Sequence, residues 1–130
     1  MKPTVLIVDD DEAITKQLFW TLCDDYEVVT ANDLQTAARR AKIYEPDVAI
    51  VDLHFPPTLD SPDVGLRILD YIKTHVPQSK VVVITSATDI EAQKACYARG
   101  ADEFFDKPFD IEKLRSTMRR LAPLQQLDFS

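Results

Sequence analysis

The amino-acid sequence predicts an α/β protein with a doubly wound, five-stranded parallel sheet and helices on both faces. Three observations predict this fold class. Short apolar runs alternate with longer segments of helical period, five times each. Most of these runs are rich in Val and Ile and show little polar alternation, which is typical of strands buried on both faces. The chain of 130 residues is long enough for one domain with its own core.

The first half of the chain contains three predicted strands and two predicted helices. The strands are apolar runs bounded by polar residues, at Thr4–Val8, Tyr26–Thr30 and Asp47–Val51. Between them, Ala13–Cys23 places apolar side chains at helical spacing, and Leu34–Ile43 is an Ala-rich helical segment. We expect Trp20 to pack on the first of these helices.

The second half contains two further strands and three helices. A helix is predicted at Val64–Thr74 from the spacing of its Leu and Ile residues, and Lys80–Thr85 is the strand that follows it. Ile90–Arg99 is predicted to be a helix that ends at Gly100, a residue that commonly terminates helices. A weaker strand, Asp102–Phe105, precedes a last helix, Ile111–Leu121, for which Asp110 is the expected N-cap.

Composition excludes several classes of function. The net charge of −7 argues against direct binding of nucleic acid by this segment, because a phosphate backbone attracts basic surfaces. No apolar stretch approaches the length of a membrane span, and there is no signal peptide. The two cysteines, Cys23 and Cys96, lack metal or redox spacing and read as small buried or half-buried side chains in a cytoplasmic protein.

Polar residues follow four of the five predicted strands. They are Asp9, Asp10 and Asp11 after the first strand, Asp52 after the third, Thr85 and Ser86 at the end of the fourth, and Lys107 after the fifth. Parallel strands bring their carboxyl ends to one rim of the sheet, where ligand sites of such folds form. Each residue alone has an ordinary explanation, and Asp11 in particular is as well explained as a helix N-cap. The combination predicts a functional site.

Clustered carboxylates repel one another unless a cation joins them, and an all-oxygen ligand set suits a hard divalent ion such as Mg²⁺. Asp10 and Asp52 are the expected direct ligands, with Asp9 beside them or acting through water. A carboxylate is also a nucleophile that can form an aspartyl-phosphate. Lys107 and the Thr85 hydroxyl could then neutralise the charge of the phosphoryl oxygens.

Four stretches of the sequence resemble receiver domains of bacterial two-component response regulators. They are LIVDDDE (Leu6–Glu12), DVAIVDLHFP (Asp47–Pro56), VVVITSA (Val81–Ala87) and GADEFFDKPFD (Gly100–Asp110). The resemblance covers about residues 3–121 and implies the receiver version of the flavodoxin-like (βα)5 fold. It also implies a signalling switch that takes a phosphoryl group from a sensor histidine kinase or a phosphotransfer domain. Such a domain is not an enzyme beyond catalysing its own phosphorylation and dephosphorylation.

The resemblance assigns a role to each matching residue. Asp52 matches the phosphorylated aspartate. Asp9, Asp10, Asp52 and the backbone carbonyl of His54 match the ligands of Mg²⁺, which Mn²⁺ can replace. Thr85 matches the switch hydroxyl, Ser86 stands where relatives mostly have Ala, Lys107 matches the phosphate-binding lysine and Phe104 the aromatic switch residue. The bond before Pro108 matches a peptide bond that the family usually holds cis.

Other features concern partners and domain limits. The segment PPTLDSPDVGL (Pro56–Leu66) is about four residues longer than the usual turn, and its form is most similar to receivers of sigma-54-dependent (NtrC-class) transcription activators. We expect it to rim the site and to select partners. The expected receiver spans residues 1–122, and 123–130 begins a tail or a linker to an output domain that regulates transcription. In the family, the face formed by Ile90–Leu121 changes on phosphorylation, and a homodimer is compatible with the resemblance. Lys113 stands where one common dimer type has an acid, however.

Two other classes of protein fit parts of this pattern. A haloacid dehalogenase-type phosphatase would use Asp9–Asp11 as its D-x-D motif, but that motif requires a Thr at Ala13 and leaves Asp52 unexplained. A flavodoxin-like FMN binder would need Ser, Thr and Gly after the first strand, where three aspartates would repel the FMN phosphate. A degenerate receiver that is not phosphorylated is a third alternative, although every required residue is present.

Overall fold

The computed structural model describes residues 2–53, 63–86 and 90–124, and within these it shows the predicted doubly wound fold. Five parallel strands form one sheet: β1 (Thr4–Val8), β2 (Glu27–Ala31), β3 (Val48–Val51), β4 (Lys80–Thr85) and β5 (Glu103–Asp106). Their order is β2-β1-β3-β4-β5, so the direction of winding reverses between β1 and β3. Crevices for ligands form at the carboxyl ends of strands at this kind of position.

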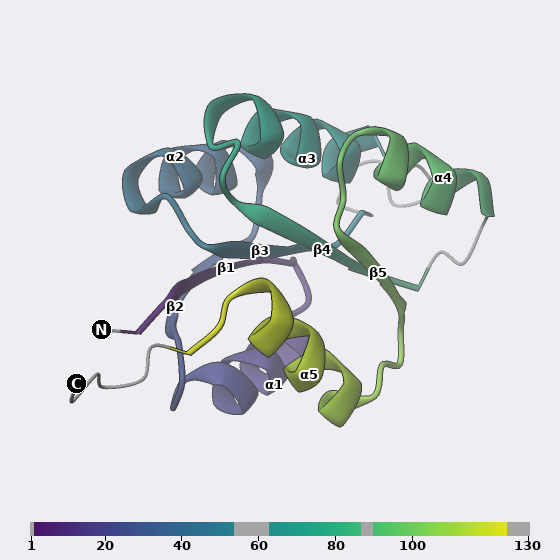
Figure 1. The fold of residues 1–130 in the computed structure, drawn as a ribbon. Helices are drawn as coiled ribbons and strands as arrows, with labels where there is room; N and C mark the ends of the chain where they lie inside the picture. Colours follow the sequence, from purple (N-terminus) through teal and green to yellow (C-terminus); the bar gives the residue numbers. More distant parts are fainter. Residues whose placement is uncertain (1, 54–62, 87–89, 125–130) are drawn as a thin grey trace.

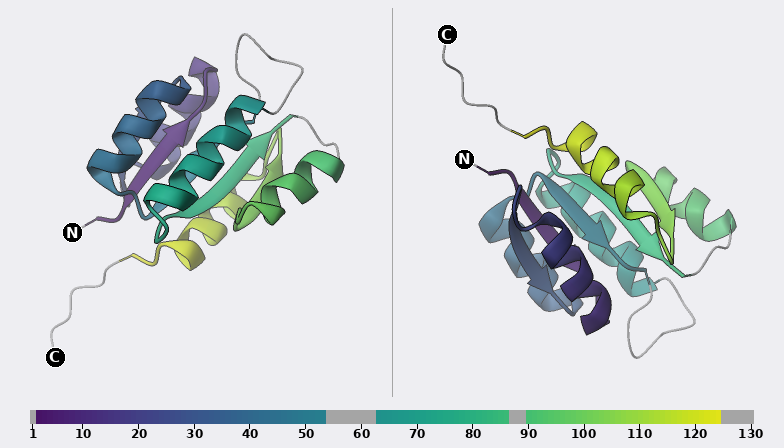
Figure 2. Two further views of the ribbon diagram at one scale, coloured as in Figure 1. Left: turned by 90° about the horizontal axis from the view of Figure 1, so that it is seen from above. Right: turned by 90° about the horizontal axis from the view of Figure 1, so that it is seen from below.

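Five helices cover the two faces of the sheet, as Figure 1 shows and the views in Figure 2 confirm. The helices are α1 (Glu12–Leu22), α2 (Leu34–Tyr44), α3 (Asp63–His75), α4 (Ile90–Ala98) and α5 (Ile111–Leu121). One face carries α2, α3 and α4, and the other carries α1 and α5. The predicted bounds of β1, β4 and α5 match the structure, and the other elements differ by one residue at one or both ends.

The core has two layers because successive strand residues point to opposite faces of the sheet. Leu6 and Val8 of β1 pack in the layer under α2, α3 and α4, whereas Val5 and Ile7 pack in the layer over α1 and α5. The central strand β3 is buried along its whole length, and β1 and β4 are buried after their first residues, as their lack of polar alternation predicted. Among the described residues, no helix is long and apolar enough to cross a bilayer.

Local signals set the ends of several helices. Asp11, Asp33 and Asp110 are the N-caps of α1, α2 and α5, and each side chain accepts hydrogen bonds from backbone N–H groups of the first turn. Gly100 follows α4 with a φ of 98°, a left-handed conformation that favours glycine. The predicted roles of Asp110 and Gly100 are therefore confirmed.

The expectation for Trp20 was wrong. Trp20 is 73% exposed and its ring meets Phe19 edge-on, since it lies on the side of α1 opposite the buried Leu18 and Leu22. Arg40 is half-buried and donates a hydrogen bond to the carbonyl of Thr30 at the end of β2. The expectation for the cysteines is confirmed, because Cys23 is half-buried and Cys96 buried, both as free thiols. The long segment 54–62, including His54, lies outside the described residues.

Candidate functional site

The candidate site lies where β1 and β3 end, at the reversal of strand order. The backbone pairing continues one residue past each strand: the N–H of Asp9 donates to Ala31 O (3.1 Å), and that of Asp52 donates to Val8 O (2.9 Å). These hydrogen bonds hold the two aspartates side by side on neighbouring strands. Asp9 and Asp52 are buried, with 5% and 7% of their surface exposed, whereas Asp10 is exposed.

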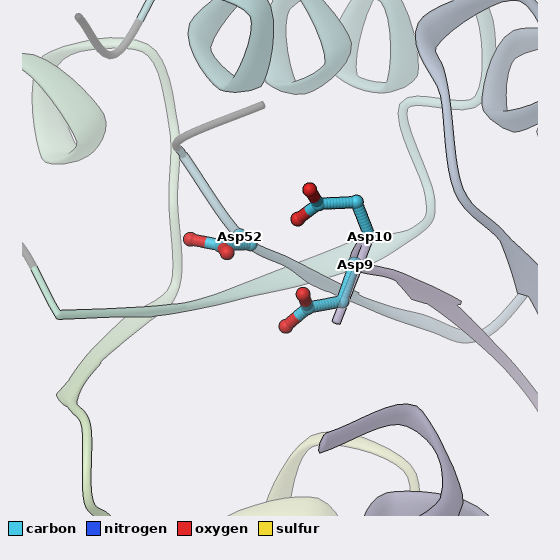
Figure 3. Close-up of side chains that lie close together, drawn as sticks. All are labelled: Asp9, Asp10 and Asp52. Carbon is cyan, nitrogen blue, oxygen red and sulfur yellow. The ribbon is translucent and has the colours of Figure 1, made fainter. Parts of the chain in front are cut away.

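Three carboxylates meet at this rim, as predicted. Each of Asp9, Asp10 and Asp52 offers an oxygen, and these oxygens all lie within 4.8 Å of one another. Figure 3 shows the three side chains gathered at the ends of two adjacent segments. This is an all-oxygen donor set with two buried members, and such a set is compatible with a divalent cation. The cluster could therefore bind a metal ion.

Lys107 brings a positive charge to the same rim. Its Nζ lies 2.9 Å from Asp9 Oδ2 and 3.1 Å from Asp52 Oδ2. Its N–H donates to Thr85 O (2.9 Å), which places the residue beside the end of β4. The bond from Lys107 to Pro108 is cis, as expected. The structure thus joins the ends of β1, β3, β4 and β5 at one point.

The electrostatics of the site show opposing effects. Burial raises the pKa of Asp9 above its usual value, although the Asp11 N–H and the Lys107 side chain act in the other direction. Burial alone would lower the pKa of Lys107, but its contacts with Asp9 and Asp52 outweigh burial and raise that pKa. The Lys107 side chain is consequently protonated at neutral pH, and it lies between Asp9 and Asp52.

The other predicted residues occupy distinct places around this centre. Thr85 is fully buried at the end of β4, and Ser86, the next residue, is exposed. Phe104 is half-buried and packs against the core layer that contains α4. The contribution of the His54 carbonyl falls outside the described residues.

The structure adds two features that the sequence did not indicate. A cleft of about 400 Å³ adjoins Asp9 and Asp10 between α1 and α2, and Lys16 and Arg40 are among its lining residues. In addition, the N–H of Asp11 donates to Asp9 Oδ1 (2.9 Å). Neither feature has a sequence signature, because both depend on how the loops after β1 and β2 turn.

Comparisons with known proteins identify the family. Residues 5–119 match the family described as response regulator receiver domain, so the chain belongs to that family. It is a receiver domain of two-component response regulators, and a phosphorylation switch is consistent with this assignment.

Among curated relatives, the chain is 30% identical to the probable transcriptional regulatory protein TcrX of Mycobacterium tuberculosis, over 90% of this chain and 50% of that protein. It is 34% identical to the nitrogen assimilation regulatory protein NtrX of Azorhizobium caulinodans, over 88% of this chain and 25% of that protein. The regulatory protein AtoC of Escherichia coli is 27% identical over 95% of this chain and 26% of its own length. The chain therefore spans half or less of the length of these relatives. The predicted likeness to receivers of sigma-54-dependent activators is confirmed.

Solved structures agree with this family. The receiver domain of NtrX from Brucella abortus is 30% identical and superposes with a TM-score of 0.79, over 90% of this chain and 96% of that one. The receiver domain of DrrB activated by BeF3 is 25% identical with a TM-score of 0.78, over 93% of this chain and 97% of that one. The family assignment decides against the phosphatase and the FMN binder.

Proposed function

We propose that this domain accepts a phosphoryl group on Asp52 from a sensor histidine kinase or phosphotransfer domain and so regulates an output domain that controls transcription. The observation that carries the proposal is the position of Lys107 Nζ, which contacts both Asp52 and Asp9 where three carboxylates converge. The likeness to transcriptional regulators twice as long or longer supports an attached output domain beyond residues 1–122. This role places the domain in the cytoplasm.

The transfer step follows from the chemistry of these residues. A carboxylate oxygen of Asp52 attacks the phosphorus, and the bond from phosphorus to the donor's leaving group breaks, with its electron pair going to the donor. Lys107 is already within hydrogen-bond distance of Asp52, so its ammonium can neutralise phosphoryl oxygens there. The Thr85 hydroxyl, at the adjacent strand end, is the second donor. Hydrolysis by water would later return Asp52 to the carboxylate, so that the domain catalyses only its own phosphorylation and dephosphorylation.

Asp9, Asp10 and Asp52 would hold Mg²⁺, or Mn²⁺ in its place, with the His54 carbonyl as a further ligand. The donor set fits such an ion because its three carboxyl groups offer only oxygens, and among the described residues Lys107 is the cation that contacts it. When bound, the ion supplies positive charge that offsets the charge of the phosphoryl group. Binding should also stabilise the fold, by about 2.7 kcal/mol at an ion concentration 100 times the dissociation constant.

Intact-mass spectrometry tests the phosphosite. Acetyl phosphate with Mg²⁺ should give a phosphoryl adduct, and EDTA should abolish it. Asp52→Asn should remove the adduct, whereas Asp24→Asn, a matched loss of one exposed carboxylate away from the site, should retain it. An adduct that persists in Asp52→Asn would show that the phosphoryl group goes elsewhere.

A further inference from the structure

Asp11 connects the acidic residues of the site to the first turn of α1. Its backbone N–H donates to Asp9 Oδ1 at 2.9 Å. Its side chain accepts from the N–H of Ala13 (2.9 Å) and the N–H of Ile14 (3.4 Å). Its carbonyl accepts from both the N–H and the hydroxyl of Thr15, each at 3.0 Å. One residue thus contacts the site with its N–H and the helix with its carbonyl oxygen and Oδ1.

The contact with Asp9 completes the orientation of that carboxylate. Oδ2 of Asp9 is held by Lys107, and Oδ1 is held by the Asp11 N–H. Because both oxygens of this buried side chain have a donor, its rotation is restricted. Among the described residues, Lys107 is the other donor that holds it.

The same arrangement restricts Asp10, which stands between Asp9 and Asp11. On one side, the Asp9 backbone is fixed to β2 by its hydrogen bond to Ala31 O. On the other side, Asp11 is held at φ −85° and ψ 110° by its role as N-cap. The exposed carboxylate of Asp10 is therefore presented from a backbone that is anchored at both ends.

We propose that Asp11 is a positioning residue that aligns Asp9 and Asp10 for a divalent cation through the N-cap of α1. The inference rests on the proposed function, since it concerns the same metal site. A simple helix cap would account for the side-chain contacts of Asp11 but not for its N–H contact with Asp9. Asp33 provides the comparison: it caps α2 by accepting from the N–H of Thr36 (2.7 Å), and it is not a member of the acidic cluster.

Coupling between two sites acts in both directions. If the N-cap contacts of Asp11 restrict the positions of Asp9 and Asp10, a cation bound to Asp9 and Asp10 should in turn stabilise the hydrogen bonds between Asp11 and the first turn of α1. Mg²⁺ should then slow hydrogen exchange at the amides of Ala13 and Ile14 but not at the amide of Thr36. This readout uses the unmodified protein, so it does not depend on whether a variant folds.

Calorimetric titration with Mg²⁺ tests the inference in the variants. Asp11→Ala should weaken Mg²⁺ binding roughly tenfold, the scale of a lost outer-shell contact at a metal site. Asp11→Asn keeps the capping oxygen and should restore most of the affinity. Asp33→Ala should lose a comparable amount of stability and bind Mg²⁺ like the wild type.

Equal Mg²⁺ affinity in Asp11→Ala and Asp33→Ala would overturn the inference, and so would unchanged exchange at Ala13 and Ile14 in the wild type. Failure of the wild type to bind Mg²⁺ is a different result. It would overturn the proposed function itself, and this inference with it.

Discussion

Lys107 and Asp52 form an ion pair of 3.1 Å although 55 positions separate them in the sequence. The parallel sheet makes this contact, because β3, β4 and β5 are neighbours and end at the same rim. The hydrogen bond from the Lys107 N–H to Thr85 O fixes where the side chain begins. The site is thus a product of the strand order.

Replacing Lys107 should slow phosphorylation. In Lys107→Met the rim keeps three carboxylates and loses its cation, so phosphorylation by acetyl phosphate should fall about tenfold, which corresponds to 1.4 kcal/mol. Lys73→Met is the matched control, because Lys73 pairs with Asp102 and donates to Ser79 O, away from the rim. Mass spectrometry over time gives the rates. Similar rates in the two variants would show that Lys107 does not serve the transfer.

The pH dependence of stability should reveal the cost of the buried Asp9 carboxylate. Its pKa is raised in the folded state, chiefly by burial, so the folded protein binds the proton more tightly than the unfolded chain does. The tighter binding of this proton stabilises the folded protein fully below the unfolded pKa of 3.8, and the stabilisation is lost as the pH rises through the pKa of Asp9 in the folded state. Without metal at pH 7, Asp9→Asn should therefore be more stable than the wild type.

Urea unfolding in EDTA measures this effect. The free energy of unfolding of Asp9→Asn should exceed that of the wild type at pH 7, and the difference should shrink as the pH falls towards 4. Asp24→Asn should show no such difference. A loss of stability in Asp9→Asn at pH 7 would mean that the Lys107 and Asp11 contacts outweigh the burial of the charge.

The conformational change that follows phosphorylation of Asp52 should depend on the Thr85 hydroxyl. A phosphoryl group on Asp52 should draw this hydroxyl towards it through a charge-assisted hydrogen bond, and Phe104 can then turn into the space that is vacated. Phe has no O–H, so its burial leaves no polar group unsatisfied. Amide chemical shifts in Ile90–Gly100 should move when beryllofluoride is added to the wild type and much less in Thr85→Ala. Equal movement in both proteins would contradict this pathway.

Gly65 should be required for the geometry of Asp52. A Cβ at this position would lie 2.3 Å from Leu53 Cα and 2.7 Å from Asp52 O, so α3 could not approach the end of β3. Gly65→Ala should lose about 3 kcal/mol of stability and should also slow phosphorylation. Gly100→Ala is a useful comparison, because it strains a φ of 98° far from the rim and should cost stability without changing the rate. Chemical denaturation and the acetyl phosphate assay separate the two effects.

The fold could be predicted from the sequence because the strands are apolar on both faces and the helices carry recognisable ends. The bounds of β1 and β4 matched because charged or polar residues adjoin them, whereas β2 and β5, at the sheet edges, are less apolar and were each placed one residue early. Trp20 was misjudged for a geometric reason. It stands two positions from Leu18, and two helical positions turn a side chain to the opposite face.

The site was predictable to the level of which residues meet, because the carboxyl ends of parallel strands share one rim. The contact of the Asp11 N–H with Asp9 was not predictable, since any residue type has an N–H and only the path of the loop aims it. The partly buried Arg40 is a similar case, because its contact with Thr30 O depends on the distance between α2 and the end of β2.

Tyr26, which follows α1, donates a hydrogen bond to the carbonyl of Ala122, directly after α5. This contact lies at the end of the sheet opposite Asp52, where the strands begin. The end of α5 is therefore fixed by a hydrogen bond at the edge of the sheet where the strands begin. The chain that continues from α5 thus leaves the domain at the end of the sheet opposite the carboxylates, and the Tyr26 hydroxyl holds its first residue in place.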